Sequence, residues 1–532
     1  MNALHALWLA QAPVLPVLLP MATAVLLLFL GTVPTGHGEP GMRLRRRLAL
    51  GSVALGGLVA IGLLLTVSDG TLLVYRVGGW APPFGIVLVI DRLSALMLVL
   101  TSTVALPALM YACSGWDARG RQFHALFQFQ LMGLAGAFVT GDLFNLFVFF
   151  EILLIASYVL LTHGLGRART RQGVHYVVIN LVASSLFLIA LALIYGTTGT
   201  LNMADVAARV AVAPADQVAV LRVVALLLLL VFGIKAALLP LNFWLPPTYA
   251  AASAPVAALF AIMTKVGVYS IIRVHWVVFG AGAGGLAGAA APWLLPLALL
   301  TSVVGVLSAL AAHSMGRLVA TLAVVSVGTI LIGVGLFTPQ ALSAALYYLL
   351  HSTLVVAALF LLVELIAAQR GTAGDRLAPA HAVREPVLLG LLLLLGSASL
   401  AGLPPLPGFL GKVMVLQASS GLPAQALVWT VVLGVGFLTL IGLTRAGVIV
   451  FWHVEDDHPG AAVSAGRSPM MLGATVIYLL LGAVMAVLAA PVKHYTDATA
   501  AQLMDRAAYQ RAVLPESLDG ALYQRPYTGE RP

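Results

Sequence analysis

Residues 143–163 read LFNLFVFFEILLIASYVLLTH, a mainly apolar run with one carboxylate, Glu151, near its middle. A run of this length can cross the hydrocarbon core of a bilayer as one α-helix, because a helix satisfies all of its own backbone hydrogen bonds. The Glu151 side chain, in contrast, must be neutralised there by a cation or by protonation. This stretch therefore predicts a membrane fold with an ionisable site inside it.

The same apolar pattern recurs along the whole chain. Of its 532 residues 61% are hydrophobic and only 9% are charged, and the mean hydropathy is +1.03. Soluble domains carry about a quarter charged residues, so a soluble enzyme is excluded. The pattern predicts an all-α polytopic membrane protein with about 14 transmembrane helices. These lie at about 7–30, 49–68, 85–111, 125–140, 143–163, 174–195, 219–239, 254–279, 292–311, 317–336, 341–367, 386–419, 425–451 and 470–491.

The arginines predict the orientation. An even number of spans puts both termini on one side, and alternate loops differ sharply in arginine content. One set of loops carries Arg43, Arg45, Arg46, Arg47, Arg119, Arg121, Arg167, Arg169, Arg171, Arg317, Arg370, Arg376, Arg384 and Arg467. The opposite loops carry only Arg76, Arg92, Arg209, Arg222 and Arg273. By the positive-inside rule the first set is cytoplasmic and both termini face outside, so the net charge of +9 reflects topology rather than nucleic-acid binding.

Two spans are interrupted by proline. Residues 235–240 read KAALLP and are followed by WLPP at 244–247, and residues 402–408 read GLPPLPG. Each break frees backbone carbonyls beside a lysine, in the seventh and the twelfth span. Broken helices in corresponding positions indicate inverted five-helix repeats, here roughly 122–279 and 290–451, with ion sites near the midplane. Two ordinary proline kinks are the alternative. We expect one transmembrane domain over 1–491 and a polar C-terminal tail over 492–532.

Three of the four lysines, Lys235, Lys265 and Lys412, lie within apolar spans. Placing a lysine at membrane depth costs about 2.5–3.5 kcal/mol on insertion scales, so this distribution indicates function. Burial disfavours the ammonium form, which lets a lysine exchange protons where an arginine would stay charged. For Lys265 the alternative is a side chain that extends to the membrane surface.

Two further residues complete the candidate set. Glu151 has the lysines as available cations, and a merely structural ion pair is its alternative. His351 is followed by Ser352 and Thr353 inside the eleventh span, where it is either a proton relay or a satisfied core histidine. Glu151, Lys235, Lys265, His351 and Lys412 are therefore the predicted proton-translocating residues.

No cofactor or metal is indicated by the sequence. The single cysteine, Cys113, excludes an internal disulfide and a thiolate metal cluster. The chain contains no Walker loop, no GxGxxG after a strand, no CxxCH and no histidine spacing typical of metal ligands. We expect a transporter component rather than an enzyme.

Several stretches resemble the antiporter-like membrane subunits shared by complex I, membrane-bound hydrogenases and the Mrp (Mnh, Pha) cation/proton antiporters. They are GDLFNLFVFFE at 141–151, YGTTGTLNM at 195–203, FWLPP at 243–247, TKVGVY at 264–269 and LPPLPGF at 403–409. The resemblance runs from about residue 75 to about 490. HSTLVVAALF at 351–360, QRG at 369–371 and DR at 375–376 are most similar to the D-type subunit of Mrp antiporters.

The resemblance implies a role for each candidate residue. The family's glutamate of the fifth helix falls on Glu151 and the lysine of the broken seventh helix on Lys235. The lysine of the eighth helix falls on Lys265, the histidine of the eleventh on His351 and the lysine of the broken twelfth on Lys412. Some relatives carry a further lysine shortly after the histidine, but this chain has VVA at 355–357, so His351 must serve alone.

The resemblance implies a proton-translocating subunit of a multi-subunit monovalent cation (Na⁺ or K⁺)/H⁺ antiporter in the bacterial cytoplasmic (inner) membrane, with other subunits as partners. The alternative is the proton-pumping membrane subunit of an NADH–quinone oxidoreductase or a membrane-bound hydrogenase, which neighbouring genes would distinguish. A third alternative is an inert membrane scaffold, against which the five buried ionisable residues argue. The sequence does not decide between Na⁺ and K⁺ or which subunit contains the cation path.

Overall fold

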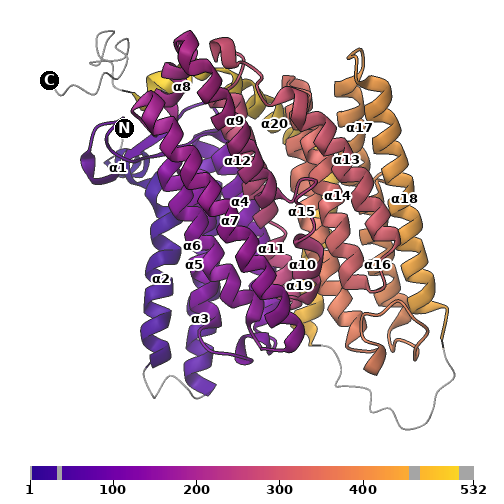
Figure 1. Cartoon of the computed structure of the whole chain (residues 1–532). Helices are drawn as coiled ribbons and strands as arrows, with labels where there is room; N and C mark the ends of the chain where they lie inside the picture. The colour runs from indigo at the N-terminus through magenta and orange to yellow at the C-terminus, as the bar shows by residue number, and fades with distance from the viewer. Residues whose placement is uncertain (1–2, 33–38, 455–467, 515–532) are drawn as a thin grey trace.

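The computed structural model describes residues 3–32, 39–454 and 468–514. Most of them form helices, and the long helices lie side by side between the two ends of the molecule, as Figure 1 shows. The helices of the first half are α1 Ala3–Gln11, α2 Leu15–Thr32, α3 Glu39–Thr66, α4 Arg92–Ala112, α5 Phe123–Val139, α6 Leu143–Thr162, α7 Arg167–Thr198, α8 Met203–Ala211, α9 Ala215–Ala236, α10 Leu245–Ala251, α11 Ala254–Phe260 and α12 Met263–Ile272. Those of the second half are α13 Ala291–Leu310, α14 Met315–Gly335, α15 Pro339–Ala367, α16 Pro386–Ala401, α17 Pro407–Ser419, α18 Gln425–Phe451, α19 Pro469–Val487, α20 Ala489–Met504 and α21 Arg506–Val513.

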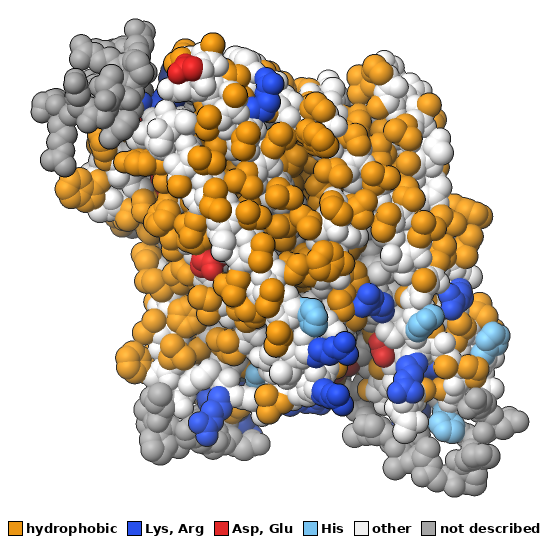
Figure 2. Space-filling model, viewed as in Figure 1, with side chains coloured by type: hydrophobic (Ala, Val, Ile, Leu, Met, Phe, Trp, Pro, Cys, Tyr) orange, Lys and Arg blue, Asp and Glu red, His pale blue; other side chains and the backbone are white. Residues whose placement is uncertain are grey.

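The helices agree with the predicted membrane spans. Twelve helical stretches of the described residues are long and apolar enough to cross a membrane, and α5 and α16 are two shorter apolar helices at predicted spans. Apolar side chains cover the middle of the molecule, and Lys and Arg gather towards its lower end in Figure 2. α12, α14 and α15 are almost completely surrounded by other helices, whereas α2, α3, α18 and α19 bury only about a third of their residues. α12, α14 and α15 therefore form the most deeply buried part of the described residues.

The third span begins later than predicted, because residues before it form a strand. β1 (Leu73–Arg76) pairs antiparallel with β2 (Val87–Ile90), with Leu73 opposite Ile90. The β-branched residues of β2 favour this pairing. Asp91 then caps α4 by accepting a hydrogen bond from the Ser94 backbone N–H at 2.8 Å. The predicted span at 85–111 is thus a helix only from residue 92.

Both proline breaks are present. α9 ends at Ala236 and its direction resumes in α10, and α16 ends at Ala401 and resumes in α17. In Figure 1 α9 and α10 descend from the end that carries α8, whereas α16 and α17 ascend towards that end. The two broken helices therefore run in opposite directions, as an inverted pair requires.

Part of the C-terminal region expected to be a polar tail is ordered on the membrane domain. α20 packs against α15 and α4, where Ser343 Oγ donates to Asp497 Oδ1 at 2.6 Å and Tyr495 OH donates to the Arg92 carbonyl at 3.1 Å. α1 and α21 both pack against the β1 strand. The first and last described helices thus lie on one side, which agrees with an even number of spans.

Candidate proton-translocation site

Glu151 and Lys235 are held by consecutive turns of one helix. The Ser184 hydroxyl donates a short hydrogen bond to Glu151 Oε1. Lys235 Nζ donates to Asn180 Oδ1 at 3.1 Å, and Asn180 Nδ2 donates to the Tyr176 carbonyl at 2.8 Å, which sets the orientation of the amide. Asn180 and Ser184 are four residues apart on α7 and therefore share a face. The carboxylate and the ammonium are thus linked through α7 and do not form a direct ion pair.

Aromatic side chains pack on the Lys235 side of this link. Phe150 lies next to Glu151 in α6, and its ring centroid is 5.8 Å from Lys235 Nζ, within the range of a cation–π contact. Phe232, one turn before Lys235, stacks on Phe150 with centroids 6.2 Å apart and meets Phe187 edge to face at 5.2 Å. Lys235 is buried, whereas Glu151 is half-buried, so the two charged groups lie in different surroundings on either side of α7.

Lys265 lies beside the α9 break. A Cβ on Gly267 would lie 2.5 Å from the Ala236 backbone nitrogen, so only glycine lets α12 pack directly on the end of α9. Lys265, two residues earlier, is fully buried and donates to Thr264 Oγ1 at 3.2 Å. At the break itself the Trp244 indole donates to the Ile234 carbonyl at 3.0 Å. Close packing of α9 and α12 therefore brings Lys235 and Lys265 into one region.

Lys412 lies at the second break. Its ammonium donates to the carbonyls of Ala401 at 2.6 Å and Leu400 at 3.3 Å, the last residues of α16. The next residue, Gly402, has a φ of +90°, a conformation that side chains disfavour. The break leaves the last carbonyls of α16 without hydrogen-bond partners in their own helix, and these carbonyls accept hydrogen bonds from Lys412 instead.

His351 faces the same break from α15. Its Nε2 makes no hydrogen bond to another described residue, and a Cβ on Gly408 would lie 2.7 Å from it. A cavity of about 20 Å³ adjoins the ring and is lined in part by Ser399 and Pro407. A water molecule needs about 10–15 Å³, so the cavity has room for one. His351 and Lys412 therefore form a second group around the α16–α17 break.

The structure thus places the five predicted residues in two groups. Lys235 and Lys265 lie at the α9 break, and Glu151 is connected to Lys235 through Ser184 and Asn180 of α7. His351 and Lys412 lie at the α16–α17 break. Among the described residues, no direct hydrogen bond joins Lys265 to His351. A proton that passes between the two groups must therefore cross a gap by another carrier.

Sequence reasoning missed the polar residues that hold the charges. Asn180 and Ser184 are spaced i, i+4 inside an apolar helix, which is a readable signal of a shared polar face. The arginine pattern also predicts a loop position for Arg273, and the structure differs. Arg273 is buried and bonds Asp91 through Nη1 at 2.5 Å and Nη2 at 3.0 Å, because the chain continues past α12 as a π-helix over Arg273–Val278.

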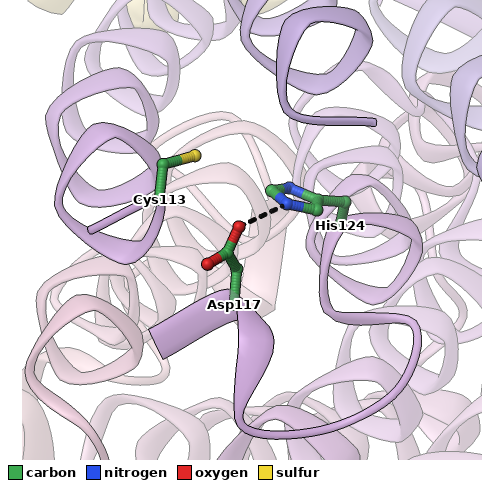
Figure 3. Close-up of side chains that lie close together, drawn as sticks. All are labelled: Cys113, Asp117 and His124. Atoms are coloured by element: carbon green, nitrogen blue, oxygen red, sulfur yellow. Dashed lines mark hydrogen bonds and ion pairs between the residues drawn. The ribbon is translucent and has the colours of Figure 1, made fainter. Parts of the chain in front are cut away.

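Figure 3 shows the three side chains whose donor atoms gather as a metal site would require, Cys113, Asp117 and His124. Their ligand atoms lie within 4.8 Å of one another. Both Asp117 oxygens, however, accept hydrogen bonds from Arg46, at 2.6 and 2.8 Å, and His124 Nε2 donates to Oδ2 at 3.0 Å. Burial raises the pKa of the Cys113 thiol to about 12, so it remains protonated. The arrangement is a hydrogen-bonded clasp between α3 and the α4–α5 connection.

Comparisons with known proteins agree with this geometry. The family described as "NADH:quinone oxidoreductase/Mrp antiporter, TM" matches residues 140–440. The D-type subunit of a probable K(+)/H(+) antiporter of Rhizobium meliloti (strain 1021) is 41% identical over 95% of this chain and 98% of its own length. The D-type subunit of the Na(+)/H(+) antiporter of Bacillus subtilis (strain 168) is 35% identical over 94% and 99%.

Solved structures show the same fold. A chain of the Mrp complex from Dietzia sp. DQ12-45-1b has a TM-score of 0.83 at 29% identity and covers 95% of this chain and 99% of its own length. A chain of respiratory complex I from Thermus thermophilus has a TM-score of 0.73 at 25% identity, with 92% and 99% covered. The chain therefore belongs to the NADH:quinone oxidoreductase/Mrp antiporter family of multi-pass membrane proteins, and within it to the D-type antiporter subunits, which are transporter components rather than enzymes.

Proposed function

We propose that this D-type subunit carries protons through a multi-subunit monovalent cation (Na⁺ or K⁺)/H⁺ antiporter of the bacterial cytoplasmic membrane, with both termini outside. The observation that carries the proposal is the link Glu151–Ser184–Asn180–Lys235 through α7, with the Phe150 ring beside Lys235 Nζ. The relatives named for K⁺ and for Na⁺ are both similar to this chain, so the proposal covers either cation.

The charge on Glu151 is the switch. While the carboxylate is ionised it favours the ammonium form of Lys235. When a proton reaches Glu151, or the two groups move apart, this stabilisation is lost and Lys235 can release its proton towards Lys265. The flexible α9–α10 break supplies the freedom for the distance to change. One pKa unit corresponds to about 1.36 kcal/mol, so a modest change in the interaction shifts proton occupancy strongly.

His351 and Lys412 form the outlet in this proposal. The cavity beside His351 has room for one water, which can carry a proton between the ring and the α16–α17 break. Lys412 holds its proton against the carbonyls of Leu400 and Ala401 and releases it when that end of the path becomes hydrated. Water mobile in the core connects Lys265 with His351.

The other subunits are required for exchange. Na⁺ prefers several oxygen ligands, whereas Glu151 is the one carboxylate near the centre of a span in the described part of the chain. We therefore expect no cation exchange by this chain alone and exchange by the assembled complex. Robust Na⁺/H⁺ or K⁺/H⁺ exchange by the purified chain in vesicles would contradict this requirement.

The decisive experiment changes the charge of Glu151 at constant shape. In everted vesicles that contain the complete complex, Glu151→Gln should abolish cation-induced proton efflux at normal expression, and Glu151→Asp should retain part of it at an altered pH optimum. Asp69→Asn is the control and should exchange at the wild-type rate, because Asp69 is exposed and its hydrogen bond from the Thr71 backbone N–H can also be accepted by an asparagine oxygen. Wild-type exchange by Glu151→Gln across the pH range would leave Glu151 a structural residue.

Membership of a redox complex is the second candidate function. The similarity to D-type antiporter subunits reaches 41% identity, against 25% for the complex I chain, which favours the antiporter. Genes for small antiporter subunits beside this one would support the antiporter. Genes for flavin and iron–sulfur subunits would instead support a redox complex.

A further inference from the structure

The outer surface of α16 and α18 carries an apolar groove with two lobes. Lobe one, of about 540 Å³, lies between the two helices and includes Leu391 and Leu394 on α16. Lobe two, of about 570 Å³, lies on the other side of α18. Leu440, Thr444 and Val448 line both lobes and form the ridge between them. α18 lies at the right-hand edge of the molecule in Figure 1, so the groove is on the periphery of this chain.

The length of the groove matches one leaflet of a bilayer. Lobe one extends along α18 from Leu440 to Phe451, which is about 17 Å of helix. Half of the hydrocarbon core is about 15 Å thick, whereas a transmembrane helix of a partner needs about 30 Å. The shape therefore fits flexible acyl chains better than a helix.

Basic groups lie at one end of the groove. Lobe two includes Arg445 and His453, and exposed Arg384 is two residues before Pro386, which lines lobe one. Arg445 donates one hydrogen bond, from Nη1 to the Leu310 carbonyl at 2.6 Å. Glu385 is the acidic neighbour of Arg384. Trp452, 75% exposed, lines lobe one at the same end, and such aromatic residues are typical of the membrane interface.

We propose that this groove binds one anionic phospholipid of the arginine-rich, cytoplasmic leaflet. Its two acyl chains lie in the two lobes, on either side of the α18 ridge, and its phosphate contacts Arg445 and His453, with Arg384 adding positive charge. A guanidinium is well suited to a phosphate, because it donates two parallel hydrogen bonds.

The groove also reaches the α16–α17 break beside Lys412. The effect on exchange that follows from this contact rests on the proposed function. Leu403, at the inner end of lobe one, belongs to the α16–α17 break that presents the carbonyls of Leu400 and Ala401 to Lys412. An acyl chain against Leu403 packs on that break and restricts its movement. Bound anionic lipid should therefore alter the exchange rate as well as occupy the surface.

Two glycines of α18 provide a matched test of binding. A Cβ on Gly447, in lobe one, or on Gly434, exposed and outside both lobes, would meet no atom within 4 Å, so larger side chains fit at either position. Native mass spectrometry of the purified complex should show a retained phosphatidylglycerol in wild type and Gly434→Phe and its loss in Gly447→Phe. Gly447→Leu serves if the phenylalanine variant does not assemble. Equal retention by both variants, or no retained lipid in wild type, would overturn the proposal.

Two further measurements test the headgroup contacts and whether a partner helix, rather than a lipid, covers the groove. Arg445→Gln combined with His453→Gln should remove the preference for phosphatidylglycerol over phosphatidylethanolamine, and an unchanged preference would refute the assigned headgroup contacts. In the assembled complex after bound lipid has been removed with detergent, Leu391→Cys should react with a maleimide, whereas the native Cys113 is buried. Protection of that cysteine would show that a partner helix covers the groove. Lipid retention is measured without exchange, so a failure of the proposed transport function would not affect this test.

Discussion

Asn180 and Ser184 lie one turn apart on α7, and each contacts one of two oppositely charged residues, Lys235 and Glu151. The separation matters because removing one partner of a direct buried ion pair leaves an uncompensated charge, which strongly opposes any change of protonation. Neutral polar groups between the charges satisfy both while permitting either to gain or lose a proton. The face of α7 is therefore as much part of the site as the charged residues themselves.

Ser184→Ala should slow exchange about tenfold, because it removes a hydrogen bond to a charged group, worth about 1.5–3 kcal/mol. Ser185→Ala is the matched control, since the adjacent Ser185 hydroxyl is exposed and bonds only the Leu181 carbonyl of its own helix. The comparison is made by proton efflux from vesicles that contain the complex. Equal rates for the two variants would exclude a role for Ser184 in the link.

Asn180→Asp should also slow exchange, for the opposite reason. It keeps the side-chain shape but places a carboxylate against Lys235 Nζ, now 3.1 Å from the amide oxygen. The resulting direct ion pair should hold the lysine in its charged form, so exchange falls although the complex assembles. Assembly is checked by co-purification of the other subunits. Faster exchange than in wild type would contradict the proposed release step at Lys235.

Lys412→Ala should abolish exchange in an assembled complex, and a milder change tests the surroundings of the same lysine. A Cβ on Gly436 would lie 3.3 Å from Lys412 Nζ and 3.4 Å from the Ala401 carbonyl oxygen. Gly436→Ala should therefore crowd the ammonium and lower the exchange rate. Gly434→Ala, on the same helix with open space at its Cβ, should leave the rate unchanged. Full activity in both Lys412→Ala and Gly436→Ala would give Lys412 a structural role only.

The low pKa of Asp117 predicts that the stability of the protein depends on pH. Burial opposes its ionisation, but the hydrogen bonds and charges of His124 and Arg46 outweigh this effect and lower the pKa to about 2. The ionised clasp therefore stabilises the fold by about 2 kcal/mol above pH 4, and this contribution is lost as the pH falls towards 2. Asp117→Asn should melt at lower temperature than wild type at pH 7, with a difference that shrinks below pH 4.

The thermal unfolding of the purified protein, followed across this pH range, measures that difference. Asp69→Asn is again the control, because the Asp69 carboxylate is exposed and exposed charges contribute little to stability. A melting-temperature difference for Asp117→Asn that stays constant from pH 7 to pH 3 would refute the assignment to this carboxylate.

The spans, the two proline breaks and the identities of the charged residues could all be predicted from the sequence. Hydrocarbon permits few backbone structures and penalises each ionisable group, so run length and the positions of Lys235, Lys265 and Lys412 carry strong signals. Whether a short apolar segment forms a helix or a strand could not be predicted in the same way. The residues before α4 pair as β2 with β1, which a count of apolar residues cannot distinguish from the start of a helix.

Only the tertiary structure decided which groups meet. Asn180 and Ser184 are ordinary polar residues in the sequence, and they become the link because α7 packs between the helices that carry Glu151 and Lys235. From the sequence, Arg273 resembles a loop residue. In the structure it is buried because its guanidinium donates hydrogen bonds to Asp91, which lies 182 positions earlier in the chain. Hydropathy and spacing indicate the environment of a residue along its own helix. The contacts described above depend instead on how neighbouring helices pack. That packing is set by residues at the helix interfaces, such as Gly267 between α12 and α9.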